Sequence, residues 1–393
     1  MKDFGFRFLL ASRALRSVGV IFMALAAPLY LAALGVSVIN IGIIYMGIAV
    51  FNAALVLVLG MLGDRIGFKP ILMIGEVITA TSALVIGLEK SSIILIAVAM
   101  IVGDIGGMVG GLRGSFSPGS TALIANNWTE DDERVKRLSK ITATASFFSI
   151  FGSALMILHG SLQNYVGSAS AFRMLFLLSA ALLWISLICI IFVSEKARAK
   201  KTTKIMKKSS FRHIAKVIAA NVVNSAGLGI AIPLLPLWFA LRFHAGTGEI
   251  GIVFTVANAL TAVGTYTAGI IRKKFELAML GGYTRSISGG ILVLMAFSPL
   301  FPIAVVLFLV RQLIMSLGAP ARLAVTVKGI HAEDYGTATS FQGVANRLAQ
   351  GSSGFGGYLM SVSLPAPVFI GGLFQVFGGL TYAKLLGKGK GKK

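Results

Sequence analysis

Ionisable side chains inside long apolar runs are the residues of this sequence with the most capacity for chemistry. If such a run spans a membrane, a charge near its middle costs about 2.5–3.5 kcal/mol and needs a partner, a water-filled cavity or a function. Apart from the basic residues that we assign to the connections, two acids and five arginines lie in such runs: Glu76, Asp104, Arg113, Arg285, Arg311, Arg322 and Arg347. Three of them, Glu76, Arg285 and Arg322, are near the ends of their runs, where we expect the side chains to extend to the aqueous surface. The other four lie deeper.

The four deep charges cannot all be neutralised by near neighbours. Asp104 and Arg113 are nine positions apart, a rotation of about 900° along a helix, so they face opposite sides of it. One of them should face a central cavity and the other should pack against helices, and the spacing leaves open which. No mid-run acid accompanies Arg311 and Arg347 in the second half of the chain. Because an unpaired buried guanidinium is costly, either Asp104 reaches across to them or a bound anion supplies the charge.

Neutral polar side chains repeat at helical spacing beside these charges. Gln342, Asn346 and Gln350 recur every fourth position next to Arg347, which favours the wall of a polar cavity over simple helix contacts. A stripe of Thr and Ser over 142–153 favours helix–helix contacts, with a second polar wall as the alternative.

A further run, 214–241, carries Asn224 in its middle and two prolines, Pro233 and Pro236, beyond it. Proline removes a backbone donor and bends or breaks a helix. The run is therefore predicted to break, either beside a binding site or as kinked packing alone.

The runs themselves predict a membrane protein. Of 393 residues, 56% are hydrophobic and 13% charged, against about 25% charged residues in a soluble domain. Each run is about as long as the roughly 20 residues that a helix needs to cross a membrane, or longer. None shows the alternation of apolar and polar residues that is typical of a membrane-spanning barrel strand. We predict an all-α membrane protein with twelve transmembrane helices and no large soluble catalytic domain. The runs are 9–34, 40–62, 70–88, 92–124, 140–160, 171–193, 214–241, 250–271, 277–297, 301–327, 336–361 and 366–384.

Basic residues are distributed unequally between the connections. One side of the predicted membrane collects most of the Lys and Arg, and the other keeps only Lys90, Arg173 and Arg242. The positive-inside rule then predicts that both termini are cytoplasmic. The net charge of +22 fits anionic lipid headgroups on that side and does not require nucleic acid.

The longest polar segment of the chain has six apolar runs before it and six after it. We predict an N-terminal bundle over 1–193, a basic cytoplasmic linker over 194–213 and a C-terminal bundle over 214–393 with a Lys-rich tail. Five identities recur at a constant separation, which supports a repeat of one half in the other. The pairs are Pro118 and Pro320, Ala122 and Ala324, Asp132 and Asp334, Ala143 and Ala345, and Gly152 and Gly354.

A glycine-rich charged segment, GMLGDRIGFK at 60–69, follows the second run. Its glycines permit a tight turn and close helix approach. The segment resembles the G-x-x-x-D-R-x-G-R-K loop motif of the major facilitator superfamily, with Phe68 at one basic position. With twelve runs and a basic central linker, the resemblance extends over essentially the whole chain.

The resemblance implies a conformational latch at this loop. Asp64 would dock against the start of the eleventh span, near Gly336 and Thr337, and against Arg134 in the outward-open state. The remaining latch residues are Gly60, Arg65, Gly67 and Lys69. The corresponding segment of the second half, 264–274, has no acid, so only one half carries a complete latch. The antiporter signature of the superfamily's fifth span is poorly matched here.

The resemblance also implies a secondary transporter and not an enzyme. In the superfamily, spans one, four, seven and ten line a central cavity, which includes the spans of three of the four deep charges. We expect Arg311 and Arg347 to hold an anionic or polar group of a small solute, with Asp104 as a titratable or ion-pairing partner. The same site would be lined by Arg113, Asn224, Gln342, Asn346 and Gln350.

Other functions stay open at this point. The first alternative is a proton-coupled exporter of drugs or other lipophilic compounds, and another is a scaffold without transport. An intramembrane protease would need a second mid-membrane aspartate, which the chain lacks. Expected partners are the solute, a coupling proton or ion and anionic membrane lipids, with the chain as a monomer. No cofactor, metal or nucleic acid is expected.

Overall fold

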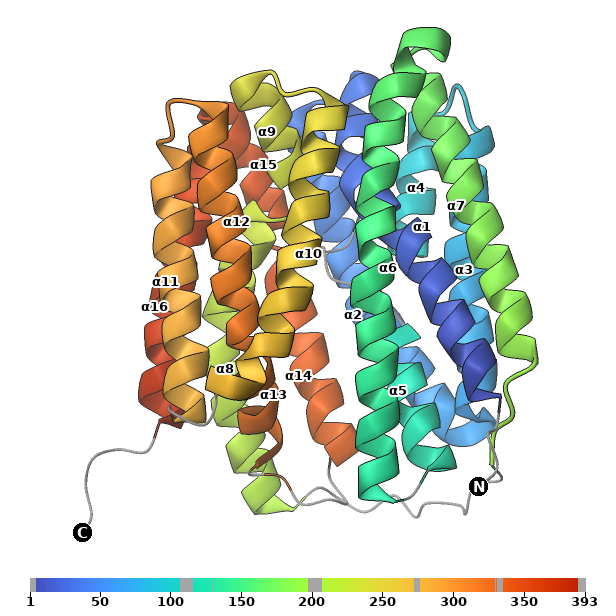
Figure 1. Ribbon diagram of the computed structural model, residues 1–393, viewed down its shortest axis with the longest axis vertical. Coiled ribbons are helices and arrows are strands. Elements are labelled where there is room, and N and C mark those ends of the chain that lie inside the picture. The colour runs from blue at the N-terminus through green and yellow to red at the C-terminus, as the bar shows by residue number, and fades with distance from the viewer. Residues whose placement is uncertain are drawn as a thin grey trace.

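The computed structural model describes residues 5–106, 116–128, 130–196, 207–271, 276–328, 330 and 335–387, and within them every regular element is an α-helix. The predicted all-helical fold is therefore confirmed. Sixteen helices run roughly parallel to one axis (Figure 1). Their bounds are α1 Phe6–Ala33, α2 Val38–Ile66, α3 Phe68–Leu88, α4 Ile93–Gly103, α5 Phe116–Asn127, α6 Asp131–Val166, α7 Ser168–Ile191, α8 Lys208–Ala231, α9 Leu235–Phe243, α10 Thr247–Ile271, α11 Leu277–Ala296, α12 Phe301–Leu317, α13 Ala319–Lys328, α14 Tyr335–Gln350, α15 Ser353–Val362 and α16 Ala366–Leu386.

The sixteen helices of the described chain correspond to twelve predicted spans, because four of these spans are interrupted. Each interrupted span contains two helices, and the pairs are α4 and α5, α8 and α9, α12 and α13, and α14 and α15. Ten helical segments of the described chain are long and apolar enough to cross a membrane, and α4 is a shorter apolar helix. The structure is thus consistent with twelve spans.

One of the four interruptions was predicted. In the run with Pro233 and Pro236, α8 ends at Ala231 and α9 begins at Leu235, which confirms the break. The runs 92–124, 301–327 and 336–361 are also interrupted, and nothing in their sequences led us to expect these breaks. Gly318 and Gly351 lie at two of these breaks, and glycine is about 1 kcal/mol less favourable than alanine within a helix.

The helices pack mainly within two groups, α1–α7 and α8–α16. The groups meet where α2 contacts α14 and α15, where α6 contacts α10, and where α1 contacts α9. α5 and α13 have their main contacts within their own groups. In Figure 1 the first group lies on the right and the second on the left.

Glycines place the closest approach of the two groups at one end of the bundle. A Cβ added to Gly42 would lie 2.7 Å from the Cα of Gly357, and one added to Gly160 would lie 2.8 Å from the Cα of Gly248. Gly42 is near the start of α2, at the end of the bundle where α1 finishes. The two groups are therefore packed backbone to backbone at that end, which is the upper end in Figure 1.

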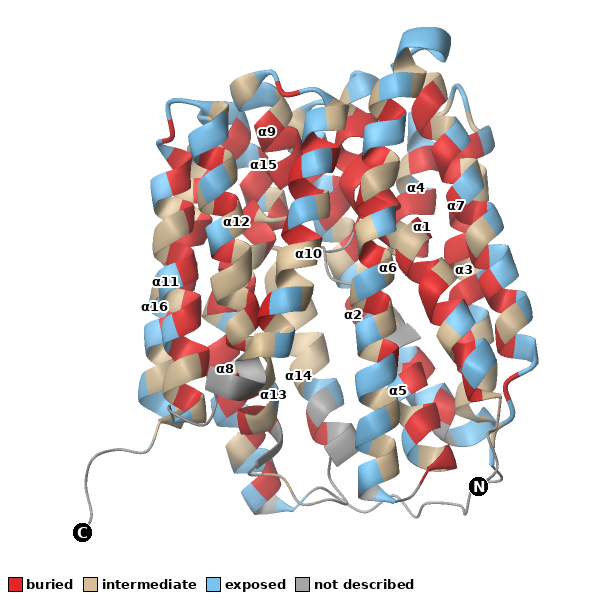
Figure 2. Ribbon diagram, viewed as in Figure 1, coloured by how far each residue is buried: buried red, intermediate tan, exposed pale blue. Residues whose placement is uncertain are grey.

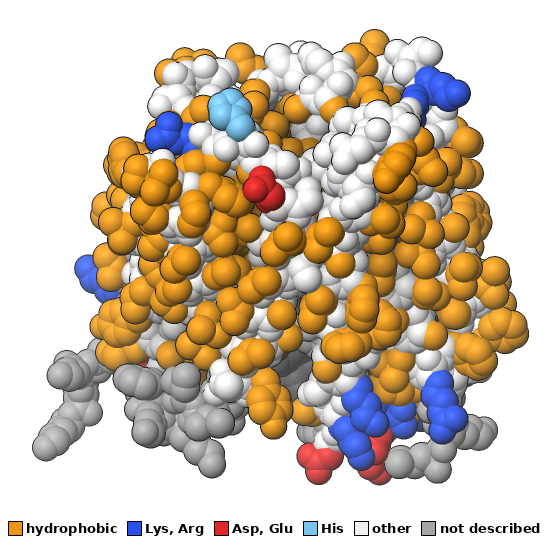
Figure 3. Space-filling view, turned by 45° about the horizontal axis from the view of Figure 1, so that its top comes forward, with side chains coloured by type: hydrophobic (Ala, Val, Ile, Leu, Met, Phe, Trp, Pro, Cys, Tyr) orange, Lys and Arg blue, Asp and Glu red, His pale blue; other side chains and the backbone are white. Residues whose placement is uncertain are grey.

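Burial follows the membrane pattern. Buried residues concentrate on the helix faces turned toward neighbouring helices, and exposed residues lie on the outer faces (Figure 2). Many exposed side chains are large and apolar, such as Ile94 and Leu323. Hydrophobic side chains cover the middle of the face in Figure 3, and basic and acidic side chains gather near its lower end. An apolar belt of this kind is stable in lipid and not in water.

Candidate transport site

Asp104 lies where α4 ends, at the interruption of the fourth span. Its backbone is left-handed, with φ of 55°, an uncommon conformation for a residue other than glycine. Its side chain is half-buried, and Gly106, two positions on, lies against the ring of Tyr45 in α2. Strained backbone of this kind occurs at functional sites more often than elsewhere.

Arg347 lies on α14, in the other group of helices, and its side chain is half-buried. It is within electrostatic reach of the Asp104 carboxylate. Two of the deep charges, far apart in the sequence, therefore influence each other across the two groups.

The neutral stripe beside Arg347 lies along α14. Its three members, Gln342, Asn346 and Gln350, are all half-buried. Asn346 Oδ1 accepts a hydrogen bond of 3.2 Å from the hydroxyl of Ser225 on α8, and the backbone of Gln350 packs against Gly229 of the same helix. One side of the stripe thus contacts α8.

Arg311 lies apart from this pair. Its side chain is 2% exposed, and it donates to Gln312 Oε1 at 2.8 Å and to Gln375 Oε1 of α16 at 3.1 Å. The guanidinium is therefore held inside the second group by amide oxygens. Contact of Arg311 with a solute stays a prediction, and in this conformation the side chain is closed off from solvent.

Asn224 packs toward α16. It is buried on α8 where that helix packs against Gly378 of α16, and its Oδ1 has no hydrogen-bond partner among the described residues. Arg113 lies outside the described residues. In the stripe over 142–153, Ser153 accepts from Asn258 Nδ2 of α10 at 3.3 Å, so this hydroxyl joins helices of the two groups.

Two residues of α2 were missed by sequence reasoning. Asn52 is 4% exposed and neither its amide nitrogen nor its oxygen has a partner among the described residues. The hydroxyl of Tyr45, two turns earlier on the same helix face, is likewise buried without a partner in the described chain. A buried polar group of this kind costs about 1–3 kcal/mol unless something binds it. The only sequence signal was a lone Asn in an apolar run.

The expectation that three charges extend to the aqueous surface is wrong. Glu76 is fully buried and forms an ion pair with Arg16 of α1. Arg285 is buried against the ring of Tyr382, with 4.7 Å from the guanidinium carbon to the ring centroid. Arg322 donates to Thr284 Oγ1 at 3.3 Å and to the carbonyl of Met315 at 2.9 Å. Tertiary contacts supply partners that position within a run could not reveal.

Comparison with known proteins decides the family. A model of the Major Facilitator Superfamily matches residues 9–353. The chain belongs to the major facilitator superfamily.

Individual relatives of this superfamily member are distant. The synaptic vesicular amine transporter of Rattus norvegicus is 25% identical over 227 residues, which are 55% of this chain and 40% of that protein. The match thus spans less than half of the relative. A D-xylose–proton symporter has the same fold, with a TM-score of 0.75, 16% identity and 99% of each chain covered. A bacterial homologue of the human lysosomal transporter Spinster gives 0.71, with 13% identity over 98% of this chain and 97% of that one.

The superfamily loop motif is anchored within the first group of helices. Glu195, which follows α7, accepts hydrogen bonds of 2.9 Å from the backbone N–H groups of Phe68 and Lys69 at the start of α3. Lys69 Nζ donates to the carbonyl of Ile191 at 2.7 Å. Gly67 has φ of 99°, and a Cβ there would lie 2.8 Å from Glu195 Oε2. The tight turn expected at Gly67 is confirmed, and its carboxylate partner was not foreseen.

The structure describes only part of the remaining latch. A Cβ at Gly60 would meet no atom of the described residues within 4 Å, so the close approach expected there is not seen among them. Arg65 is exposed and Arg134 is half-buried on the first turn of α6. The side chains of Asp64 and Thr337 lie outside the described residues. The latch itself therefore stays a prediction.

Proposed function

We propose that this superfamily transporter moves a small polar solute with an anionic group by alternating access, and that Arg347 binds that group. The observation that carries the proposal is that Arg347 and Asp104 lie in different groups of helices and within electrostatic reach of each other. The strength of this interaction would change when the halves rock about a site between them. The division at 194–213 is part of the proposal, because it lets each six-span half move as a unit.

Asp104 gives the proposal a route to ion coupling. When Asp104 is ionised, it competes with the solute's anionic group for Arg347. When it is protonated, the guanidinium is released and a solute anion can take its place. Proton and solute would then bind together, and Tyr45 and Asn52 would supply hydrogen-bonding groups on the α2 side.

The proposal also includes the orientation of the protein in the membrane and its conformational state. With both termini cytoplasmic, the end closed by Gly42, Gly357, Gly160 and Gly248 faces outward. The conformation described is then inward-facing. The latch at Asp64 belongs to the outward-open state and would form only after the halves rock.

The test is binding and uptake by the full-length protein. A panel of small mono- and dicarboxylates is screened by thermal shift at two pH values, and the best probe is labelled for uptake into proteoliposomes. Arg347→Gln should weaken its binding by at least about 30-fold. Asp104→Asn should retain binding but remove its pH dependence. The matched control Arg242→Gln, at the exposed end of α9, should behave as the parent protein. Unchanged anion binding in Arg347→Gln refutes the proposal.

A cationic amine or lipophilic drug is the second candidate solute. It is favoured by the amine transporter among the relatives and by the carboxylate at Asp104. In that case the dependence on the two charges reverses. Asp104→Asn would abolish proton-driven transport of an amine, and Arg347→Gln would be tolerated.

A further inference from the structure

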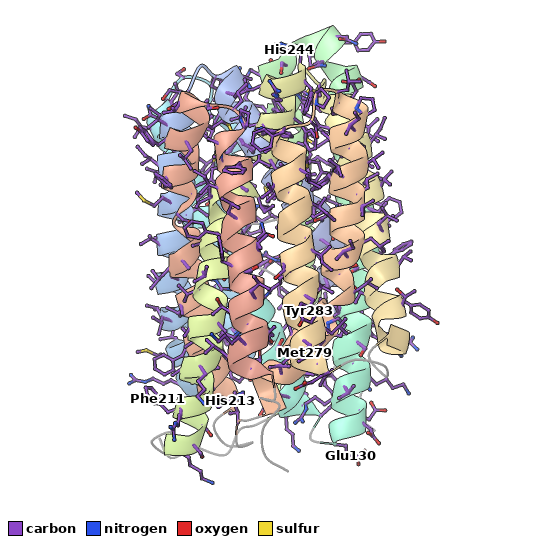
Figure 4. The ribbon with its side chains drawn as sticks, turned by 90° about the vertical axis from the view of Figure 1, so that its left-hand side faces the viewer. Glu130, Phe211, His213, His244, Met279 and Tyr283 are labelled. Carbon is purple, nitrogen blue, oxygen red and sulfur yellow. The ribbon has the colours of Figure 1, made fainter. Side chains whose placement is uncertain are left out.

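A groove on the outer surface lies between the first turns of α8 and the end of α16. Its volume is about 500 Å³, and it is lined by Phe211, Arg212, Ala215, Lys216, Ala219 and Leu385. Phe211 is labelled at the lower end of the bundle in Figure 4, at the outer edge of the view. Its lining residues lie on α8 and α16, which are not among the helices through which the two groups chiefly meet.

The sequence of α8 creates the groove. Ile214, Val217 and Ala220 on one face of the helix are buried against neighbouring helices. The opposite face presents Ala215 and Ala219, four positions apart, so their small side chains form a continuous furrow. Phe211 and Leu385, which are 58% and 46% exposed, form apolar walls beside it.

Two cations also line this groove. Arg212 and Lys216 are exposed and four positions apart, hence on the same face of α8. Neither forms an ion pair with a described residue. The sequences of α8 and α16 contain no Asp or Glu, and α16 adds Lys384 near its end. The groove therefore combines an apolar surface with positive charge that no acid on α8 or α16 neutralises.

We propose that this groove binds one anionic phospholipid. The phosphate lies between Arg212 and Lys216, and an acyl chain runs over Ala215 and Ala219 between Phe211 and Leu385. Basic side chains at the polar boundary of a bilayer attract anionic headgroups, each by about 1 kcal/mol. Burial of the chain adds the apolar contribution that a free phosphate ion lacks.

The groove's charge and surroundings argue for this occupant over a protein. The lining faces outward from spanning helices, where lipid is the neighbouring phase. A second copy of the chain would bring the same basic face to the groove, and like charges would repel.

The experiment uses the purified full-length protein in uncharged detergent. Thermal unfolding is followed while dioleoyl phosphatidylglycerol or dioleoyl phosphatidylcholine is added in mixed micelles, and bound lipid is counted by native mass spectrometry. Phosphatidylglycerol should raise the midpoint and remain bound as one molecule, and phosphatidylcholine should do neither. The double variant Arg212→Gln/Lys216→Gln should weaken the effect by roughly 20- to 30-fold.

Three controls make the outcome decisive. Arg212→Lys should retain binding, which shows that loss in the double variant is not misfolding. Lys90→Gln/Arg242→Gln removes two charges at the other end of the bundle and should leave binding unchanged. Ala219→Phe, which fills the furrow, should reduce lipid binding while both charges stay. Equal binding by the double variant, or the same stabilisation by glycerophosphoglycerol without acyl chains, overturns the proposal.

Discussion

The two halves bury arginine by different means. In the first half, Arg16 of α1 forms an ion pair with Glu76 of α3, and both side chains are less than 5% exposed. In the second half, Arg285, Arg311 and Arg322 are held by amide, hydroxyl and carbonyl oxygens and by the ring of Tyr382, and no described acid bonds to them. The Arg16–Glu76 pair neutralises its charge, whereas these three guanidinium groups of the second half are solvated by dipoles among the described residues.

The difference predicts how each half responds to substitution. Removing one member of a buried ion pair leaves the other charge uncompensated, which is strongly destabilising. Removing a buried arginine that has only neutral partners leaves no opposite charge behind. The first half should therefore be the more sensitive to loss of a single charged side chain.

The largest expected effect is that of Glu76→Gln. The substitution leaves Arg16 buried without its carboxylate and should lower the free energy of unfolding by about 3–5 kcal/mol. The loss in free energy of unfolding is measured by denaturant unfolding in mixed micelles. The double variant Glu76→Gln/Arg16→Met should recover most of the loss. A loss of less than about 1 kcal/mol in the single variant would contradict the prediction that the first half is the more sensitive to loss of one charge.

The matched test in the second half is Gln375→Leu. It removes the acceptor at 3.1 Å from Arg311 and should cost about 1.5–3 kcal/mol, the range for a hydrogen bond to a charged group. Arg311→Met in the same background should restore stability, because the charge and its acceptor are then both gone. If Arg311→Met alone lowers the free energy of unfolding as much as Glu76→Gln, the stability of the second half depends on the charge of Arg311, contrary to the prediction.

A smaller effect is expected at the aromatic ring under Arg285. Tyr382→Leu removes the cation–π contact and should cost about 1–2 kcal/mol beyond the change in packing. Tyr382→Phe keeps the ring, and its hydroxyl is 3.5 Å from the carbonyl of Arg322, so little should change. Equal unfolding midpoints for the Leu and Phe variants would show that the ring does not stabilise the guanidinium.

The smallest effect concerns two acids outside the spans. Glu89 Oε1 accepts from the backbone N–H groups of Lys90, Ser91 and Ser92, and these bonds lower the pKa of Glu89. Its stabilisation is complete above the ordinary pKa of 4.5 and is lost as pH falls through the lower folded value. In the second half, Glu249 accepts one bond, from Gly246. Glu89→Gln should flatten the acid limb of the unfolding profile, which is measured by thermal unfolding as a function of pH.

Much of the fold was determined by the sequence itself. Apolar runs of spanning length and the loop over 60–69 predicted the helical membrane fold and the superfamily, because composition and local spacing decide whether a segment enters lipid. The proline break between α8 and α9 was also predictable, because proline in mid-run removes a backbone donor and bends or breaks a helix. Pro28 shows the limit of this rule, since it lies inside the continuous helix α1.

The partners of the buried charges were decided only by the tertiary structure. Position within a run placed Glu76 near an aqueous end, yet Arg16 from a different helix meets it in the interior. Three further features depend in the same way on how helices rotate against one another. They are the electrostatic influence of Asp104 on Arg347, the hydrogen bond of Arg311 to Gln375, and the amide of Asn52, which has no partner among the described residues. A buried charge is stabilised by whatever dipole or ion lies within a few ångströms, and those neighbours are brought together by packing between distant segments.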